Sequence, residues 1–176
     1  MAAMHGPRVF YGYQNQMLVL ALKGHIRYMA ARSLRPALDD IVARRHHDTM
    51  IIDLRELEAI DSTGMGLLAR LGRQTLQQGR RAVLVCSVED VTLCLRSAAF
   101  DTLFIVVEHW PFDEEPDMTE MPIETPSLEP DIVGHFMLEA HLDLAALSES
   151  NQQEFGGVIA ALTTDLERRN RSARGN

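Results

Sequence analysis

Residues 51–68 read IIDLRELEAIDSTGMGLL, and this stretch decides the class of the fold. It opens with an apolar run, crosses a charged loop and reaches Ser62, after which apolar residues recur at helical spacing. Apolar residues on consecutive positions are typical of a strand that is covered on both faces of a sheet. The stretch therefore predicts a central strand, a loop, and a helix that begins beside Ser62.

Further strands and helices alternate on both sides of this stretch, up to about residue 110. The strand candidates are 9–13, 17–22, 49–54, 82–86 and 103–107. The helix candidates are 34–41, with Ser33 as N-cap and Pro36 in the first turn, then the helix that begins beside Ser62 and ends near Gly79, and 91–96. Strands interleaved with helices predict an α/β domain over residues 1–110, in which helices pack on a mixed β-sheet.

Composition divides the remainder of the chain into a linker and a helical segment. Residues 111–130 hold five of the seven prolines and most of the acidic excess, which predicts an extended, largely unfolded linker. Residues 131–170 carry two apolar stripes at helical spacing, which predict a helical hairpin whose second helix opens with a capping box at Ser150. Residues 171–176 are expected to be a disordered tail. The hairpin must bury its stripes against the first domain, a second copy of the chain, or another protein.

Charge and cysteine content exclude several classes of function. The net charge of −8 comes mainly from the linker, and the balanced remainder leaves no basic footprint for nucleic acid. Cys86 and Cys94 match no zinc-ligand spacing, and we expect buried free thiols, which suit the reducing cytoplasm. The apolar run 17–22 is too short for a membrane span. We therefore expect a cytoplasmic protein without a metal, a cofactor or a membrane span.

The residues from Asp61 to Leu68 also form a motif. They match, residue for residue, the D-S-[ST]-G-x-G-x-L segment of bacterial anti-sigma factor antagonists, which carries a phosphorylatable Ser at a helix N-terminus. The run LKGHI at 22–26, the helix after it and the strand at 82–86 follow the order and spacing of the same family. On these residues the chain resembles a STAS domain of the anti-sigma factor antagonist type, over about residues 8–109.

The resemblance implies a partner switch rather than an enzyme. The unphosphorylated domain would bind an anti-sigma factor or a serine kinase of the same type, and phosphorylation of Ser62, or alternatively of Thr63, would release it. A phosphatase of the PP2C type would reset the switch. The residues expected at the partner surface are Asp61, Thr63, Gly64, Met65, Gly66, Arg27, Arg70 and Arg73, the last two on an exposed helix face.

The physical chemistry of a helix start agrees with this implied role of Ser62. The first turn of a helix presents unpaired N–H groups and the positive end of the helix dipole, so it favours an added phosphate. Phosphorylation adds roughly −1.5 to −2 charges beside Asp61, and a partner packed there would meet repulsion. Gly64 and Gly66 lower helix propensity, and two explanations stand: close approach of a kinase or anti-sigma surface, or relief of crowding against a neighbouring strand.

Several alternatives stay open at this point. Arg27 stands where family members often have Asp, and it either pairs with a phosphate on Ser62 or is a solvated side chain. Ser62 is alternatively a helix N-cap without chemistry. A hydrolase is disfavoured, because Ile60 stands where the G-x-S-x-G motif requires Gly and no His or acid can be assigned as base.

The chief rival function is a STAS interaction subunit of a transporter or sensory complex that has no phosphorylation cycle. The C-terminal helices are open to three roles: dimerisation, covering the α/β domain, or recruiting a partner through their apolar stripe. We expect the domain to remain folded when residues 111–176 are removed.

Overall fold

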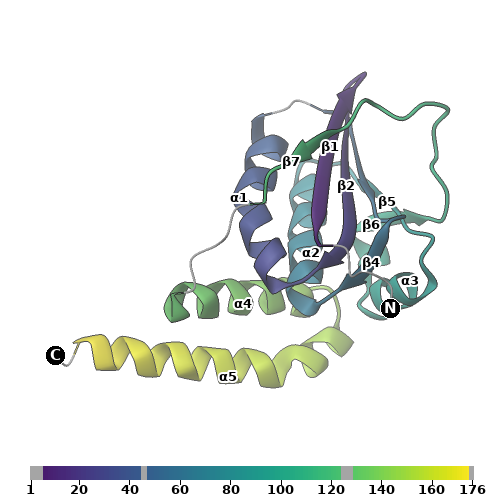
Figure 1. Cartoon of the computed structure of the whole chain (residues 1–176). Coiled ribbons are helices and arrows are strands. Elements are labelled where there is room, and N and C mark those ends of the chain that lie inside the picture. Colours follow the sequence, from purple (N-terminus) through teal and green to yellow (C-terminus); the bar gives the residue numbers. More distant parts are fainter. Residues whose placement is uncertain (1–5, 45–46, 124–128, 175–176) are drawn as a thin grey trace, which may run out of the picture.

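The computed structural model describes residues 6–44, 47–123 and 129–174, which form a sheet flanked by helices and a helical hairpin at one end (Figure 1). The strands are β1 (Arg8–Gln14), β2 (Met17–Ile26), β3 (Thr49–Asp53), β4 (Leu57–Ile60), β5 (Ala82–Val85), β6 (Phe104–Val107) and β7 (Thr119–Met121). The helices are α1 (Tyr28–Arg44), α2 (Ser62–Gln77), α3 (Glu89–Ser97), α4 (Pro130–Ala145) and α5 (Glu149–Arg174), with a short 3-10 turn at Phe100–Thr102. Within these described residues no helix is long and apolar enough to cross a membrane.

The sheet is mixed, as the sequence predicts. Its strand order is β6-β5-β3-β2-β1-β7, and β4 pairs with β2 off this path. The pairs β2–β3, β3–β5 and β5–β6 are parallel, whereas β1 pairs antiparallel with β2 and with β7. This alternation of parallel strands with helices confirms the predicted α/β class.

A bend in β2 places the end of β4 next to the start of α2. β2 pairs first with β3 and then with β4, and the register shifts between Gly24 and His25. Gly24 has a φ of 72°, a left-handed conformation that glycine adopts without a steric penalty. Beyond the bend, the Asp61 N–H donates to the Ile26 carbonyl at 3.3 Å. The N-cap residue that precedes Ser62 is therefore fixed to the end of β2.

Both faces of the central strands are covered, which confirms the expectation drawn from their continuous apolar runs. One face packs under α1 and α2 and contains alternate strand residues such as Leu20 and Ile52, both fully buried. The other face contains Val19, Ile51 and Val85, and these pack against residues of the segment that follows β6, Trp110 and Met118 among them.

Helix α1 begins earlier than its periodicity predicts. It starts at Tyr28 rather than after Ser33, and Pro36 lies inside the helix instead of in its first turn. The cause is a distant residue: the Tyr28 N–H donates to a carboxylate oxygen of Asp61 at 2.8 Å. A side chain 33 positions away thus satisfies an N–H group that the helix itself leaves unpaired.

The segment expected to be a largely unfolded linker contains a strand. β7 pairs with the edge of the sheet through β1, with Val9 opposite Met121. Residues 124–128 of that linker lie outside the described residues.

The predicted helical hairpin is present as α4 and α5, with two differences in its bounds. The hydroxyl of Ser148, not Ser150, accepts from the N–H of Asn151 at 3.1 Å and caps α5. Helix α5 continues to Arg174, so the predicted disordered tail is wrong for residues 171–174. Residues 175 and 176 lie outside the described part of the chain. In Figure 1, α4 lies between α2 and α5, so it is the first of the two helices that meets the α/β domain.

Candidate functional site

Asp61 organises the backbone around Ser62. One of its carboxylate oxygens accepts from the Gly64 N–H at 2.9 Å and from the Thr63 hydroxyl at 2.5 Å, which makes Asp61 the N-cap of α2. The other oxygen accepts from the Tyr28 N–H at the start of α1. A single side chain therefore fixes the first turns of two helices, and Ser62 is the first residue of α2.

Replacing Asp61 with alanine should lower the free energy of unfolding by about 2 kcal/mol, at the upper end of the range for helix N-caps. The reason is that two helix starts and the Thr63 hydroxyl lose their acceptor together. Asp61→Asn is the matched control, because its single amide oxygen can still cap α2 but its NH₂ group cannot accept from Tyr28. We expect its loss, measured by urea unfolding, to be smaller than that of alanine; equal stability of the alanine variant and the wild type would contradict the assignment.

The Ser62 hydroxyl contacts a histidine of the C-terminal hairpin. Its Oγ lies 3.0 Å from Nε2 of His141 on α4, and Nδ1 of the same ring lies 2.7 Å from the Met137 carbonyl oxygen. A carbonyl only accepts, so Nδ1 carries the proton, and in the neutral ring Nε2 accepts from Ser62. His141 is buried and Ser62 is half-buried. The hairpin thus covers the residue that the motif identifies.

Two glycines of the motif allow two different close approaches. A Cβ added to Gly64 would lie 2.8 Å from the Ile26 carbonyl oxygen and 2.8 Å from Ile60 Cγ1, so this glycine lies against the ends of β2 and β4. A Cβ added to Gly66 would lie 2.6 Å from both Cβ and the carbonyl oxygen of Ala140. The crowding explanation therefore applies to Gly64 at a strand, while Gly66 accommodates the chain's own helix α4.

Ion pairs join the hairpin to the same helix face. The guanidinium of Arg73 donates to the Asp143 carboxylate at 2.6 Å and to the Asp143 carbonyl at 2.8 Å. Burial raises the pKa of Asp143, and the positive charge of Arg73 opposes this rise. Arg35 of α1 pairs with Glu139 of α4 in a similar way. The carboxylates of α4 thus meet basic side chains of α1 and α2.

The prediction that Arg70 and Arg73 lie on an exposed helix face is wrong. Both side chains are half-buried, and Arg70 pairs with Asp39 of α1 at 3.1 Å. The hairpin covers this face, and the periodicity of α2 alone cannot reveal such a cover. Arg27 is exposed and forms no ion pair with another described residue.

Met65 and Thr63 lie in the interior rather than at a surface. Met65 is 5% exposed, with its sulfur 3.5 Å from the Cys94 sulfur. Thr63 is 3% exposed and its hydroxyl is bonded to Asp61. Of the two candidate phosphorylation sites, Ser62 is therefore the more accessible.

Sequence reasoning missed His141 and Ala140 as parts of this site. His141 lies 79 positions from Ser62, and the nearest sequence signal was the apolar stripe of α4, which indicates burial but not what it is buried against. The Ser62–His141 pair resembles a nucleophile and its base, yet the second ring nitrogen is bonded to a carbonyl of its own helix and not to a carboxylate. The pair is thus a contact between α2 and the hairpin.

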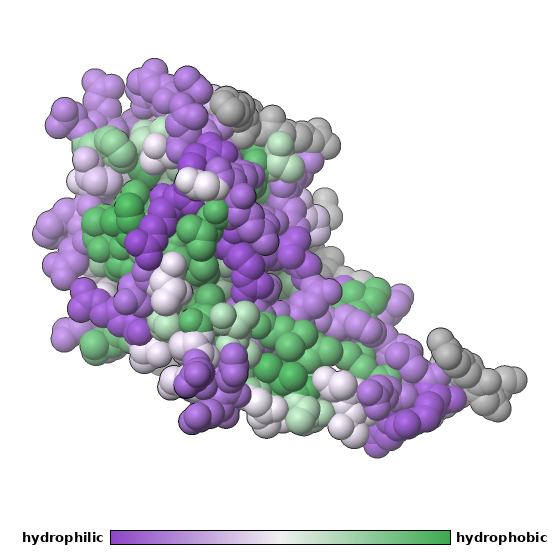
Figure 2. Space-filling view, turned by 180° about the vertical axis from the view of Figure 1, so that it is seen from behind, coloured by the Kyte–Doolittle hydropathy of each residue, from purple (hydrophilic) through white to green (hydrophobic). Residues whose placement is uncertain are grey.

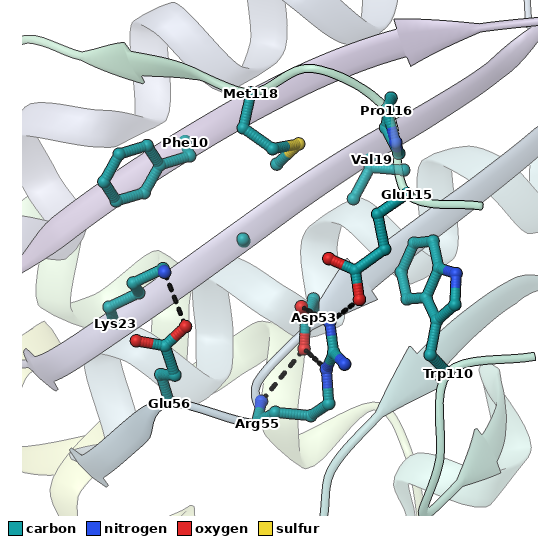
Figure 3. Close-up of a pocket in the computed structure, with 11 residues that line it drawn as sticks. Phe10, Val19, Lys23, Asp53, Arg55, Glu56, Trp110, Glu115, Pro116 and Met118 are labelled. Atoms are coloured by element: carbon teal, nitrogen blue, oxygen red, sulfur yellow. Dashed lines mark hydrogen bonds and ion pairs between the residues drawn. The ribbon is translucent and has the colours of Figure 1, made fainter.

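A second group of charged side chains surrounds a small cavity on the other face of the sheet (Figure 3). Its volume is about 70 Å³. The ion pairs that line it are Lys23–Glu56 at 2.5 Å, Arg55–Asp53 at 2.8 Å and Arg55–Glu115 at 2.7 Å. Each charged group therefore has an opposite charge beside it. Glu115 belongs to the segment after β6, so its ion pair with Arg55 attaches that segment next to the sheet. Across the described ranges no cluster of His, Cys, Asp or Glu is suited to a metal ion.

Comparisons with known proteins identify the α/β part of the chain. The family model described as "STAS domain" matches residues 12–117, which excludes both helices of the hairpin. An anti-sigma factor antagonist from Mycobacterium paratuberculosis has a similar structure, with a TM-score of 0.55, 19% identity, and coverage of 62% of this chain and 92% of that one. A search of curated proteins found no significant match.

Two structures of SpoIIAA show weaker likeness. The unphosphorylated form of this anti-sigma factor antagonist aligns with a TM-score of 0.49 and 16% identity, covering 60% of this chain and 90% of that one. The phosphorylated form, described as a Bacillus cell fate determinant, aligns with a TM-score of 0.47 and 16% identity, covering 58% and 91%.

Proposed function

The chain belongs to the STAS domain family, and from this premise we propose that it is an anti-sigma factor antagonist that works as a phosphorylation-controlled partner switch. In this proposal the unphosphorylated form binds an anti-sigma factor or a serine kinase of the same type. Phosphorylation of Ser62 releases that partner, and a phosphatase of the PP2C type restores binding. The family and the STAS fold were both expected from the motif, and both are confirmed.

The position of the Ser62 hydroxyl is the observation that carries the proposal. It lies at the first residue of α2, where backbone N–H groups and the helix dipole favour an anion. Its hydrogen bond is to His141, which belongs to the hairpin and not to the α/β domain. Without the hairpin contact, the hydroxyl is a candidate acceptor for a phosphoryl group. Thr63 is the weaker candidate because its hydroxyl is buried and donates to Asp61.

Electrostatics supports release on phosphorylation. A phosphoserine at position 62 would add roughly −1.5 to −2 charges next to the Asp61 carboxylate. A partner that packs on the first turn of α2 would then have to desolvate both charges. Arg27 is exposed and directly precedes Tyr28, whose N–H donates to Asp61, so it is suited to contact either a partner or the phosphate.

The test is affinity capture from a lysate of the source organism, with the wild type, Ser62→Ala and Ser62→Asp as baits. Mass spectrometry then identifies the captured partners and the modified residues. We expect Ser62→Ala to retain the partner and Ser62→Asp to lose at least about tenfold in recovery, the factor that corresponds to 1.4 kcal/mol of binding free energy.

Ser97→Asp is the matched control for charge, since Ser97 is exposed on α3 and lies outside the motif. It should capture the same proteins as the wild type. Equal recovery of the same proteins by Ser62→Ala and Ser62→Asp would contradict the switch.

A second candidate function is a STAS interaction subunit of a transporter or sensory complex that is never phosphorylated. The Ser62–His141 bond favours it, because a hydroxyl that fastens the hairpin has a structural role. The same capture experiment separates the two: phosphopeptides that contain Ser62 support the switch, whereas transporter subunits recovered equally with all Ser62 variants support the second candidate.

A further inference from the structure

We propose that α4 is a built-in occupant of the partner-binding face, and that the external partner binds there with a helix of the same chemistry: an aromatic residue, then a small residue between two acidic ones. The proposal rests on the function proposed above and adds to it what the partner presents and how access to Ser62 is controlled. While α4 is docked, Ser62 is closed both to a kinase and to a partner.

Helix α4 and the face formed by α1 and α2 are complementary in shape. Helix α4 crosses α2 with Ala140 directly over Gly66, so closely that even a methyl group on Gly66 would collide with the α4 backbone. Phe136, one turn earlier on α4, packs edge-on against the Tyr28 ring at a centroid distance of 5.8 Å. The face therefore accepts a helix with a small residue at its centre and an aromatic residue four positions before it.

Helix α4 and the same face are also complementary in charge. The face contains Arg35 from α1 and Arg73 from α2. Arg35 pairs with Glu139 of α4, and Arg73 pairs with Asp143 of α4. These two acids flank Ala140 in the pattern Glu-Ala-x-x-Asp. Such charge pairs contribute orientation and specificity as well as affinity. We expect a competing helix to carry carboxylates at the same two positions, because without them the half-buried Arg73 would lose the acceptor that Asp143 supplies. Among the described residues, Arg35 would keep only Asp39, 4.0 Å away on its own helix.

The contact with Ser62 makes docking and phosphorylation exclude each other. Ser62 Oγ and His141 Nε2 lie at hydrogen-bond distance, which leaves no room for a phosphoryl group between them. The hairpin must therefore move before a kinase can reach the hydroxyl, and a phosphorylated Ser62 prevents α4 from returning to the same position.

The hairpin is suited to be displaced because it lies outside the part of the chain that matches the family model. The sheet and its helices α1, α2 and α3 supply most residues of the buried core, to which the hairpin adds the buried Phe136 and Leu144 and the partly buried Leu147 and Phe155. Figure 2 shows an apolar band along the hairpin. Leu142 of α4 is 48% exposed, so it lies on the outer, solvent side of its helix. This outer side also supplies a control position on the same helix.

The first experiment measures how accessible position 62 is in the full-length chain. Ser62→Cys introduces a reporter thiol, and its alkylation is followed site by site by mass spectrometry. We expect the natural thiols to react slowly, because Cys86 is buried and burial raises the pKa of Cys94. Ala140→Glu is combined with the reporter to undock α4, and Leu142→Glu adds the same charge on the outer side.

We expect Ala140→Glu to raise the alkylation rate of the reporter about tenfold or more, as the open population rises, and Leu142→Glu to leave it unchanged. Asp143→Arg is a second opening variant, which sets two positive charges against each other at the edge of the interface. Circular dichroism and the urea midpoint report whether the α/β domain remains folded. Unchanged alkylation in both opening variants, or unfolding of the α/β domain in both, would overturn the proposal.

The second experiment tests the chemistry of the occupant. A fluorescent peptide of residues 130–147 is added to each full-length chain. We expect it to bind the Ala140→Glu chain but neither the wild type nor Leu142→Glu, and we expect Glu139→Lys with Asp143→Lys in the peptide to abolish binding. If the peptide fails to bind the open chain, the proposal that a helix of this chemistry occupies the face is refuted. The capture by Ser62 variants, which does not involve the peptide, would still decide the proposed function.

Discussion

Replacing Asn151 with alanine is expected to lower the free energy of unfolding by about 2–4 kcal/mol. This loss is the sum of two costs, that of leaving buried carbonyl groups unpaired and that of creating a small cavity. Asn151 is fully buried at the start of α5. Its amide donates to the Ala98 carbonyl at 3.0 Å and to the Leu144 carbonyl at 2.9 Å. These bonds tie the turn of the hairpin to the end of α3, so we expect their loss to free the hairpin as well as to reduce stability.

Urea unfolding measures the loss, and hydrogen exchange of α4 measures the release of the hairpin. Asn170→Ala is the matched control, because Asn170 is exposed on the same helix, and its effect should stay within about 0.5 kcal/mol. Similar stabilities of the two alanine variants would show that Asn151 does not anchor the hairpin.

Replacing Gly66 with alanine is expected to destabilise the chain by about 1–3 kcal/mol, the range for overpacking a close contact. The added methyl group would meet backbone and side-chain atoms of Ala140 at 2.6–2.7 Å, and backbone cannot yield as a flexible side chain does. The simplest relief is for α4 to move away from α2. We therefore expect faster proteolysis of the hairpin together with the lower urea midpoint.

The control for Gly66 is the same substitution at Gly157, which lies inside α5, where an added Cβ would meet no described atom within 4 Å beyond its neighbours and its own helix backbone. There alanine should raise stability by about 0.5–1 kcal/mol, because it favours the helix more than glycine does. The two substitutions are thus expected to have opposite signs. A gain in stability from Gly66→Ala would contradict the close packing of α2 and α4.

These results bear on how the proposed switch is controlled. Both Gly66 and Asn151 act on the hairpin, the first where α4 crosses α2 and the second where α5 begins. If the hairpin competes with a partner, variants that loosen it should increase partner capture even when Ser62 is unchanged. Partner binding would then depend on two equilibria, docking of the hairpin and phosphorylation of Ser62.

The sequence by itself determined the elements whose signals are local. Continuous apolar runs identified the buried central strands, and the motif from Asp61 to Leu68 identified the strand-loop-helix unit and its family. Such features depend on residues within a few positions of one another, so periodicity and capping chemistry are enough to find them. The apolar stripes of α4 and α5 likewise identified the hairpin.

Only the tertiary structure decided what those elements contact. Helix α1 begins at Tyr28 because Asp61, from another loop, accepts its N–H. Ser62 is covered because His141 reaches it from α4, and Arg73 is half-buried because Asp143 faces it. An amphipathic stripe indicates that one face of a helix is buried, but it does not indicate which element covers that face. The covering element is determined by how the surfaces of complete helices pack together.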